Sequence, residues 1–170
     1  MKTKKQEERI DAYLSQFEDA VRPLYYDIVL YLSELGYNPK KEKASISFKH
    51  ELHTKQMAKM GTKVSKARGV FPFFSLRFLA CRGYSQRFAD IVRAYIVKYP
   101  TRAARCVDGG CDYCRGEVHG HVYAYTFPGG KTRAYCGAYA VEIPDMGAED
   151  VAEIKKLIRE EHAYLVMYEV

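Results

Sequence analysis

Four of the five cysteines in the chain fall between positions 106 and 136, and their spacing restricts how that part can fold. Cys111 and Cys114 have the two-residue gap that lets a tight turn aim two sulfur atoms at one zinc ion. Cys106 precedes them across a glycine-containing loop, and Cys136 follows after a strand-like run. A zinc ion with four thiolate ligands is nearly always structural. The sequence therefore predicts a structural Zn2+ site formed by Cys106, Cys111, Cys114 and Cys136, with His119 as the alternative fourth ligand.

The pair Cys111 and Cys114 also admits thiol–disulfide chemistry, which makes a redox enzyme the alternative function. In thioredoxin-like proteins such a pair lies at a helix N-terminus after a strand, whereas this pair precedes Gly116 and a strand-like run. The series Cys111-x2-Cys114-x4-His119 resembles three of the four ligands of a retroviral-type zinc knuckle, which would imply nucleic-acid binding. Ala124 stands where that family has its fourth cysteine.

Two alternating runs, 119–127 and 131–143, flank a Pro-Gly-Gly segment and predict a β-hairpin. With a two-residue turn, Cys136 would lie opposite His121, within reach of the other cysteines. A one-residue slip of the register would move every side chain to the other face.

The three-residue loop is the alternative register. It would bring Lys131 and Arg133 onto the face that carries Tyr123 and Tyr125, and such a mixed face can stack on nucleic-acid bases. We expect instead that the aromatic residues of this hairpin face the core.

Elsewhere the apolar residues follow helical or strand-like spacing. Spacings of three and four predict four helices, at 7–20, from Arg22-Pro23 to Gly36, from Ser85 to 98, and from 151 to 165. Alternation predicts strands at 46–48 and 73–80, with a turn at 37–39, while the lysine-rich segment 50–68 receives no assignment. The pattern predicts one α+β domain over 1–170, with a mainly antiparallel sheet and a zinc-ribbon-like Cys-rich loop and hairpin at 106–143.

Charge is concentrated in the middle of the chain. Residues 38–105 carry sixteen basic and three acidic side chains, whereas the segments on either side are net acidic. This distribution favours a positive face for a phosphate-bearing partner, either nucleic acid or a phosphorylated small molecule. The candidate anion-binding residues are the arginines on and around the middle helix, Arg82, Arg87, Arg93, Arg102 and Arg105.

Catalytic motifs are missing from the sequence, which has no matched carboxylate pair, no Ser-His-Asp order and no dinucleotide fingerprint. A non-catalytic binding or regulatory role is therefore favoured over an enzyme. His50 and His53 lie three residues apart in a lysine-rich segment and are assigned no metal role. No apolar run approaches the roughly 20 residues of a membrane helix, and the basic N-terminus lacks the apolar run of a signal peptide. We expect a cytoplasmic protein that does not contact a membrane.

The N-terminal helix pattern carries one family resemblance. Ile10-Asp11-Ala12-Tyr13-Leu14, followed by Phe17, Val21-Arg22-Pro23-Leu24 and Ile28, resembles the opening of the YdhG-like family of small bacterial α+β domains, which are similar in fold to frataxin. The Met-Pro-x-Phe segment of that family is not evident, and the cysteine cluster is foreign to it. The resemblance implies an α+β fold and no site residue.

Overall fold

The structure, a computed structural model, describes residues 1, 3–67, 69–111, 113 and 120–169. The described helices are α1 (Lys4–Leu14), α2 (Arg22–Glu34), α3 (Gln86–Lys98), the short 3-10 helix η1 (Arg105–Asp108) and α4 (Ala148–Glu169). The described strands are β1 (Tyr37–Lys41), β2 (Ser45–His50), β3 (Gln56–Ser65), β4 (Gly69–Arg77), β5 (Val122–Thr126), β6 (Thr132–Cys136) and β7 (Ala140–Ile143). The predicted α+β class, with four α-helices and a mainly antiparallel sheet, is confirmed.

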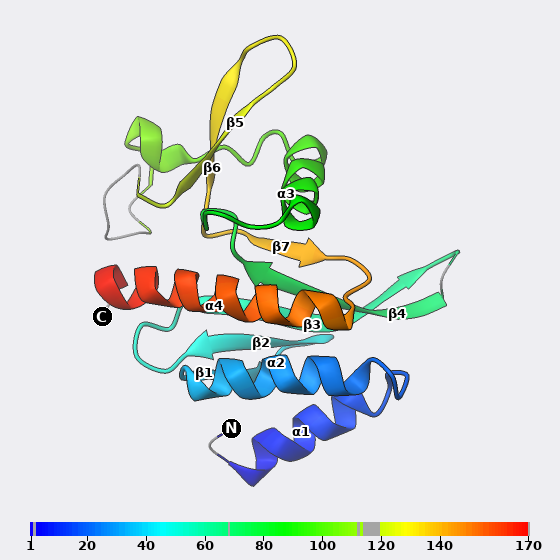
Figure 1. The fold of residues 1–170 in the computed structure, drawn as a ribbon. Helices are drawn as coiled ribbons and strands as arrows, with labels where there is room; N and C mark the ends of the chain where they lie inside the picture. The colour runs from blue at the N-terminus through cyan, green and yellow to red at the C-terminus, as the bar shows by residue number, and fades with distance from the viewer. Residues whose placement is uncertain (2, 68, 112, 114–119, 170) are drawn as a thin grey trace.

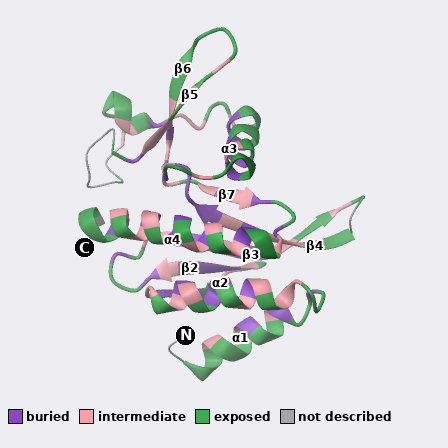
Figure 2. Ribbon diagram, viewed as in Figure 1, coloured by how far each residue is buried: buried purple, intermediate pink, exposed green. Residues whose placement is uncertain are grey.

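A five-stranded antiparallel sheet in the order β1-β2-β3-β4-β7 forms the centre of the fold, and β5 pairs with β6 in a separate two-stranded sheet. Helices α2 and α4 cross one face of the large sheet, and α3 and the β5–β6 hairpin lie beyond its β7 edge (Figure 1). Figure 2 shows buried and exposed stripes along α2 and α4. The core between the layers includes Phe48, Phe74 and Leu76 from the sheet and Leu32 and Ile158 from the helices.

Helix α2 follows the prediction closely. Pro23 lies in its first turn, where the missing N–H has no helical partner to lose. Its buried residues recur at helical spacing, and Gly36 ends the helix region with a φ of +87°, a conformation that costs a side chain more than it costs glycine. A Cβ at Gly36 would also lie 2.9 Å from His50 Nε2, so glycine is required here twice over.

Two local predictions were wrong, and one segment without an assignment contains a strand. Helix α1 begins at Lys4 and ends at Leu14, earlier than the predicted 7–20. The predicted turn at 37–39 is the start of the edge strand β1, where Pro39 pairs with Phe48, and an edge strand tolerates a proline. The unassigned lysine-rich segment contains β3, in which Ala58 and Met60 face the helices while lysines alternate on the other side.

The hairpin prediction was right in kind and wrong in register. Val122 pairs with Cys136 and Tyr125 with Arg133, which corresponds to the three-residue loop. The predicted second run is two strands, because the chain turns at Gly137 and β7 joins the large sheet beside β4. A Cβ at Gly137 would lie 2.6 Å from a ring carbon of His121, so this corner needs glycine.

The face of the hairpin that carries its aromatic side chains packs toward the body of the protein, as expected. Tyr123, Tyr125 and Phe127 are partly buried against the core. Arg133 shares this face and donates a hydrogen bond to the carbonyl oxygen of Pro100 at 3.3 Å. Within the described residues, no helix is both long and apolar enough to cross a membrane.

Candidate functional site

The cysteine loop lies against the β5–β6 hairpin. The Ala104 N–H donates to the Ala134 carbonyl oxygen at 2.8 Å, which holds the segment before η1 beside β6. Cys106 lies in η1 and Cys136 ends β6. Burial raises the pKa of the Cys136 thiol, the charges of Cys106 and Cys111 raise it further, and Arg77 opposes the rise.

No disulfide bond joins Cys106, Cys111 and Cys136 to one another. Within the described ranges, no three His, Cys, Asp or Glu side chains are arranged to hold a metal ion. The predicted ligand Cys114 and its alternative partner His119 lie outside the described residues. The three described cysteines lie in η1, in the loop after it and at the end of β6, and zinc binding stays a prediction.

A lysine ties the cysteine loop to the turn between β2 and β3. Lys55 Nζ donates to the Tyr113 carbonyl oxygen at 2.8 Å, and the same ammonium lies 3.6 Å from the centre of the Tyr113 ring. A cation against an aromatic face adds electrostatic attraction to the hydrogen bond. The loop is therefore fastened on the sheet side as well as on the hairpin side.

A buried ion cluster joins the hairpin to β4 and α4. Arg77 pairs with Glu161, and the second carboxylate oxygen of Glu161 lies 2.8 Å from His121 Nε2. All three side chains are at most 5% exposed, and the His121 ring stacks on Tyr164 with centroids 4.2 Å apart. Buried charges of this kind persist only when they are paired, because an unpaired partner carries the full cost of desolvation.

This cluster is not among the sequence predictions, although one feature of α4 indicates it. In α4 the apolar positions Ile154, Leu157, Ile158 and Leu165 lie on one helix face, and Glu161 falls on that same face. A carboxylate on an apolar stripe needs a buried partner. The sequence does not say that the partner is an arginine at the end of a strand.

Three histidines from two separate parts of the chain gather around the buried Tyr37. The rings of His50 and His53 stack with centroids 4.1 Å apart, and the Tyr37 hydroxyl lies 3.1 Å from His162 Nδ1. The Nδ1 atoms of His50 and His53 accept backbone N–H groups of Leu52 and Lys55 at 3.3 and 3.1 Å. Burial lowers the pKa of His162, and the neighbouring His50 lowers it further. The structure therefore gives His50 and His53 a packing role.

The five candidate anion-binding arginines differ in their contacts. Arg87 makes a two-pronged ion pair with Asp150, at 2.6 and 2.8 Å, and this pairing raises the pKa of the guanidinium. Arg93 pairs with Asp90 within α3. Arg87 therefore joins α3 to α4, and Arg93 is paired within α3.

Arg102 is held by aromatic residues. Its guanidinium donates to the Tyr95 hydroxyl at 3.0 Å and lies 4.1 Å from the centre of the Tyr99 ring. The side chains of Arg82 and Arg105 are exposed. Anion binding by the arginines of this group stays a prediction.

The lysines of the basic segment are arranged differently. Because strand side chains alternate between faces, the register of β1, β2, β3, β4 and β7 places every second residue on the face opposite α2 and α4. We call it the open face, and its residues include Asn38, Lys40, Ser45, Ser47, Lys49, Lys59, Gly61, Lys63, Ser65, Phe71, Phe73, Ser75 and Glu142. The side chains of Lys49, Lys59 and Lys63 are 38%, 36% and 43% exposed.

Two glutamates hold the lysines of the open face in position. Lys59 and Lys49 lie 2.8 and 3.9 Å from the carboxylate of Glu42, and Lys63 pairs with Glu142. The hydrogen bond from Lys59 is the largest influence that lowers the pKa of Glu42. At partly exposed sites such pairs contribute little stability, so an incoming anion can compete for these ammonium groups.

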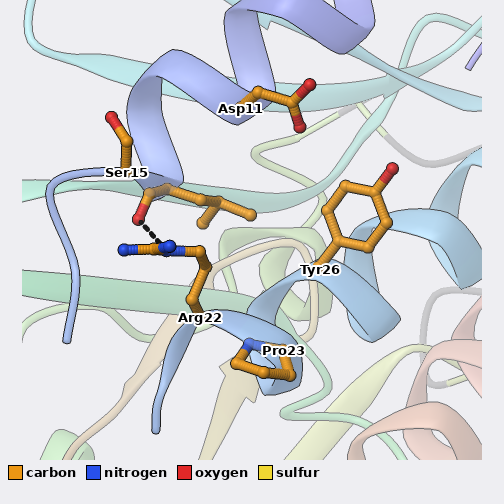
Figure 3. A pocket seen from close by; sticks show the side chains of 6 residues that line it. Asp11, Ser15, Arg22, Pro23 and Tyr26 are labelled. Carbon is orange, nitrogen blue, oxygen red and sulfur yellow. Dashed lines mark hydrogen bonds between the residues drawn. The ribbon is translucent and has the colours of Figure 1, made fainter. Parts of the chain in front are cut away.

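The hollow between α1 and α2 has a structural explanation. It is lined by Asp11, Leu14, Ser15, Arg22, Pro23 and Tyr26. Figure 3 shows the Arg22 side chain reaching toward the end of α1, where Nε donates to the Leu14 carbonyl oxygen at 3.2 Å. Arg22 also donates to the Phe17 carbonyl oxygen at 3.1 Å. The arginine thus satisfies carbonyl groups that a helix end leaves without partners.

No protein-family model, curated protein or solved structure matches the chain. The resemblance of residues 10–28 to the YdhG-like family stays a prediction.

Proposed function

We propose that the protein is a non-catalytic binding protein whose open face takes a phosphate-bearing partner and whose cysteine loop is held by a structural Zn2+. The observation that carries the proposal is the gathering of Lys40, Lys49, Lys59 and Lys63 on the open face. The segment 38–77, which supplies its first four strands, has ten basic and two acidic residues. Clustered cations on one face attract polyanions over a range set by the salt concentration.

The zinc part of the proposal is supported by the positions of three cysteines in the fold. Cys106, Cys111 and Cys136 come from η1, the loop after it and the end of β6, so one ion would connect all three segments. Zinc binding to such a set becomes folding free energy for the region it connects. Cys114 would complete the four thiolates, with His119 as the alternative. Thiol–disulfide exchange between Cys111 and Cys114 is the competing function.

Binding of inorganic polyphosphate tests the proposed partner class. We expect the protein to bind the chain at about 50 mM salt, with an affinity that falls steeply as salt is raised. Lys59→Gln should weaken binding, whereas Lys98→Gln, on α3 and outside the open face, should leave it unchanged. The proposal is wrong if polyphosphate does not bind at low salt, or if both variants lose the same affinity.

A further inference from the structure

An aromatic ring lies on the open face among the lysines. Phe73 pairs with Gly61 across β3 and β4, and a Cβ at Gly61 would lie 2.5 Å from Cε1 of the Phe73 ring. The absence of a side chain at Gly61 therefore leaves the space over the strand that the ring occupies. Glycine weakens a strand interior and often marks a place where another group approaches the backbone closely.

The neighbours of Phe73 are basic and polar. Lys63 Nζ lies 4.9 Å from the centre of the Phe73 ring. Lys59 pairs with Ser75 on the adjacent ladder position, and Phe71 is the next side chain on the same face of β4. The Phe73 ring thus lies beside the ammonium group of Lys63, and Lys59 occupies the adjacent ladder position on the same face of the sheet.

We infer that the open face binds single-stranded nucleic acid, with a base stacked on Phe73 and backbone phosphates at Lys59 and Lys63. This inference rests on the proposed function and names its partner. Proteins that bind single strands combine aromatic side chains, on which bases stack, with a basic surface that follows the phosphates. A sheet surface presents both on alternate residues of neighbouring strands.

Other phosphate-bearing partners fit this face less well. A phosphorylated small molecule needs a concave site that surrounds most of its surface. The described hollow that includes Lys5, Tyr13, Lys41 and Thr62 lies beside α1, and Phe73 and its neighbouring lysines do not line it. In a duplex the bases are stacked on one another, so Phe73 could contact a base only in an unpaired strand.

Glu42 and Glu142 would compete with a bound strand for the ammonium groups of the open face. Glu142 pairs with Lys63, and Glu42 holds Lys49 and Lys59. A bound strand would take these ammonium groups from the carboxylates. Glu142→Gln should therefore strengthen binding of the strand. The substitutions of Lys59, Phe73 and Gly61 should instead weaken it.

The test measures a labelled oligothymidine of about fifteen nucleotides and unlabelled inorganic polyphosphate against the same variants. Phe73→Leu should weaken oligothymidine binding about tenfold and leave polyphosphate binding unchanged. Lys59→Gln should weaken both, and Glu142→Gln should strengthen both. Phe127→Leu, which changes a partly buried ring on the hairpin, should alter neither.

Gly61→Ala provides a second way to disturb the ring without touching a lysine. Its new Cβ would displace the Phe73 ring, so oligothymidine binding should fall while polyphosphate binding stays unchanged. Thermal unfolding of each variant, followed by circular dichroism, identifies any loss of fold. Phe73→Leu decides the matter alone if Gly61→Ala does not fold.

Three outcomes would overturn the inference. If both probes bind and Phe73→Leu changes neither, no base stacks on Phe73, and the proposed function stands. If neither probe binds at low salt, the inference and the proposed function fail together. If light scattering finds a dimer, and Lys59→Gln and Phe73→Leu both dissociate it without affecting oligothymidine binding, the open face is an interface between two copies of this chain.

Discussion

The five-stranded sheet and the β5–β6 hairpin are held in place by different means. The large sheet carries apolar side chains under two helices, whereas Tyr135 is the one buried residue within β5 and β6, both of which are described throughout. A two-stranded hairpin is marginal by itself in water. It is fastened here by the ion cluster of Arg77, His121 and Glu161, and we propose that zinc at the cysteines near its base adds to this. A region too small to form a core of its own thus depends on a few specific polar contacts for its stability.

Truncation of the sheet core should have the largest effect. Phe74 is fully buried and contacts the Tyr25 ring at 6.2 Å between centroids. Phe74→Ala should lower the free energy of unfolding by about 4 kcal/mol, through lost burial and the cavity left behind. Urea denaturation followed by circular dichroism measures it. Val64→Ala, at a side chain 81% exposed, is the control and should change the free energy by less than about 0.5 kcal/mol.

Removal of one charge from the ion cluster should come next. Glu161→Gln leaves Arg77 buried without a counter-ion, and we expect a loss of about 3 kcal/mol in the free energy of unfolding. The matched control is Glu160→Gln, whose carboxylate accepts the Arg82 N–H and whose amide oxygen can still do so. Equal losses in the two variants would show that the cluster does not hold the hairpin to the body.

Removal of zinc should destabilise the β5–β6 hairpin and leave the five-stranded sheet unchanged. Addition of a chelator should speed amide hydrogen exchange in β5 and β6 by at least about tenfold, because local opening no longer breaks metal bonds. Exchange in β1–β4 should stay unchanged, and those strands are the internal control. Unchanged exchange in the hairpin would mean that the cysteines contribute nothing to its stability.

A smaller effect should appear on acidification. The pKa of His162 is lowered from 6.5 by burial and by His50, so in the window just below pH 6.5 the unfolded chain binds more protons than the folded one. Stability should therefore be fully present above pH 6.5 and decline as the pH falls toward the lowered value. His162→Gln should flatten this dependence in melting curves recorded across that range. A variant as sensitive to pH as the parent protein would assign the effect to other groups.

The apolar patterns predicted much of the fold. Spacings of three and four located α2 and α3, and alternation located β2 and β4, because burial of one face determines these elements. β3 was missed because its outward lysines concealed the inward Ala58 and Met60. The sequence predicts a turn where β1 lies, because Pro39 is unfavourable in most strands, although an edge strand accepts it.

The candidate site was less accessible from sequence. Cysteine spacing predicted a zinc site at Cys106, Cys111, Cys114 and Cys136, which stays a prediction, and the hairpin register used for it was off by one residue. The arginine face was chosen by charge alone, and charge does not reveal which guanidinium groups, such as those of Arg87 and Arg93, pair with acids. The stacked pair of His50 and His53 is local, whereas His162 reaches it from α4, and no local sequence pattern predicts that distant contact.

Native mass spectrometry of freshly purified protein tests most directly whether a metal holds the hairpin region. The account predicts one zinc ion per chain, lost in Cys136→Ser and retained in His119→Ala. Absence of zinc, with four reduced thiols or a Cys111–Cys114 disulfide, would contradict it and would favour thiol–disulfide chemistry instead.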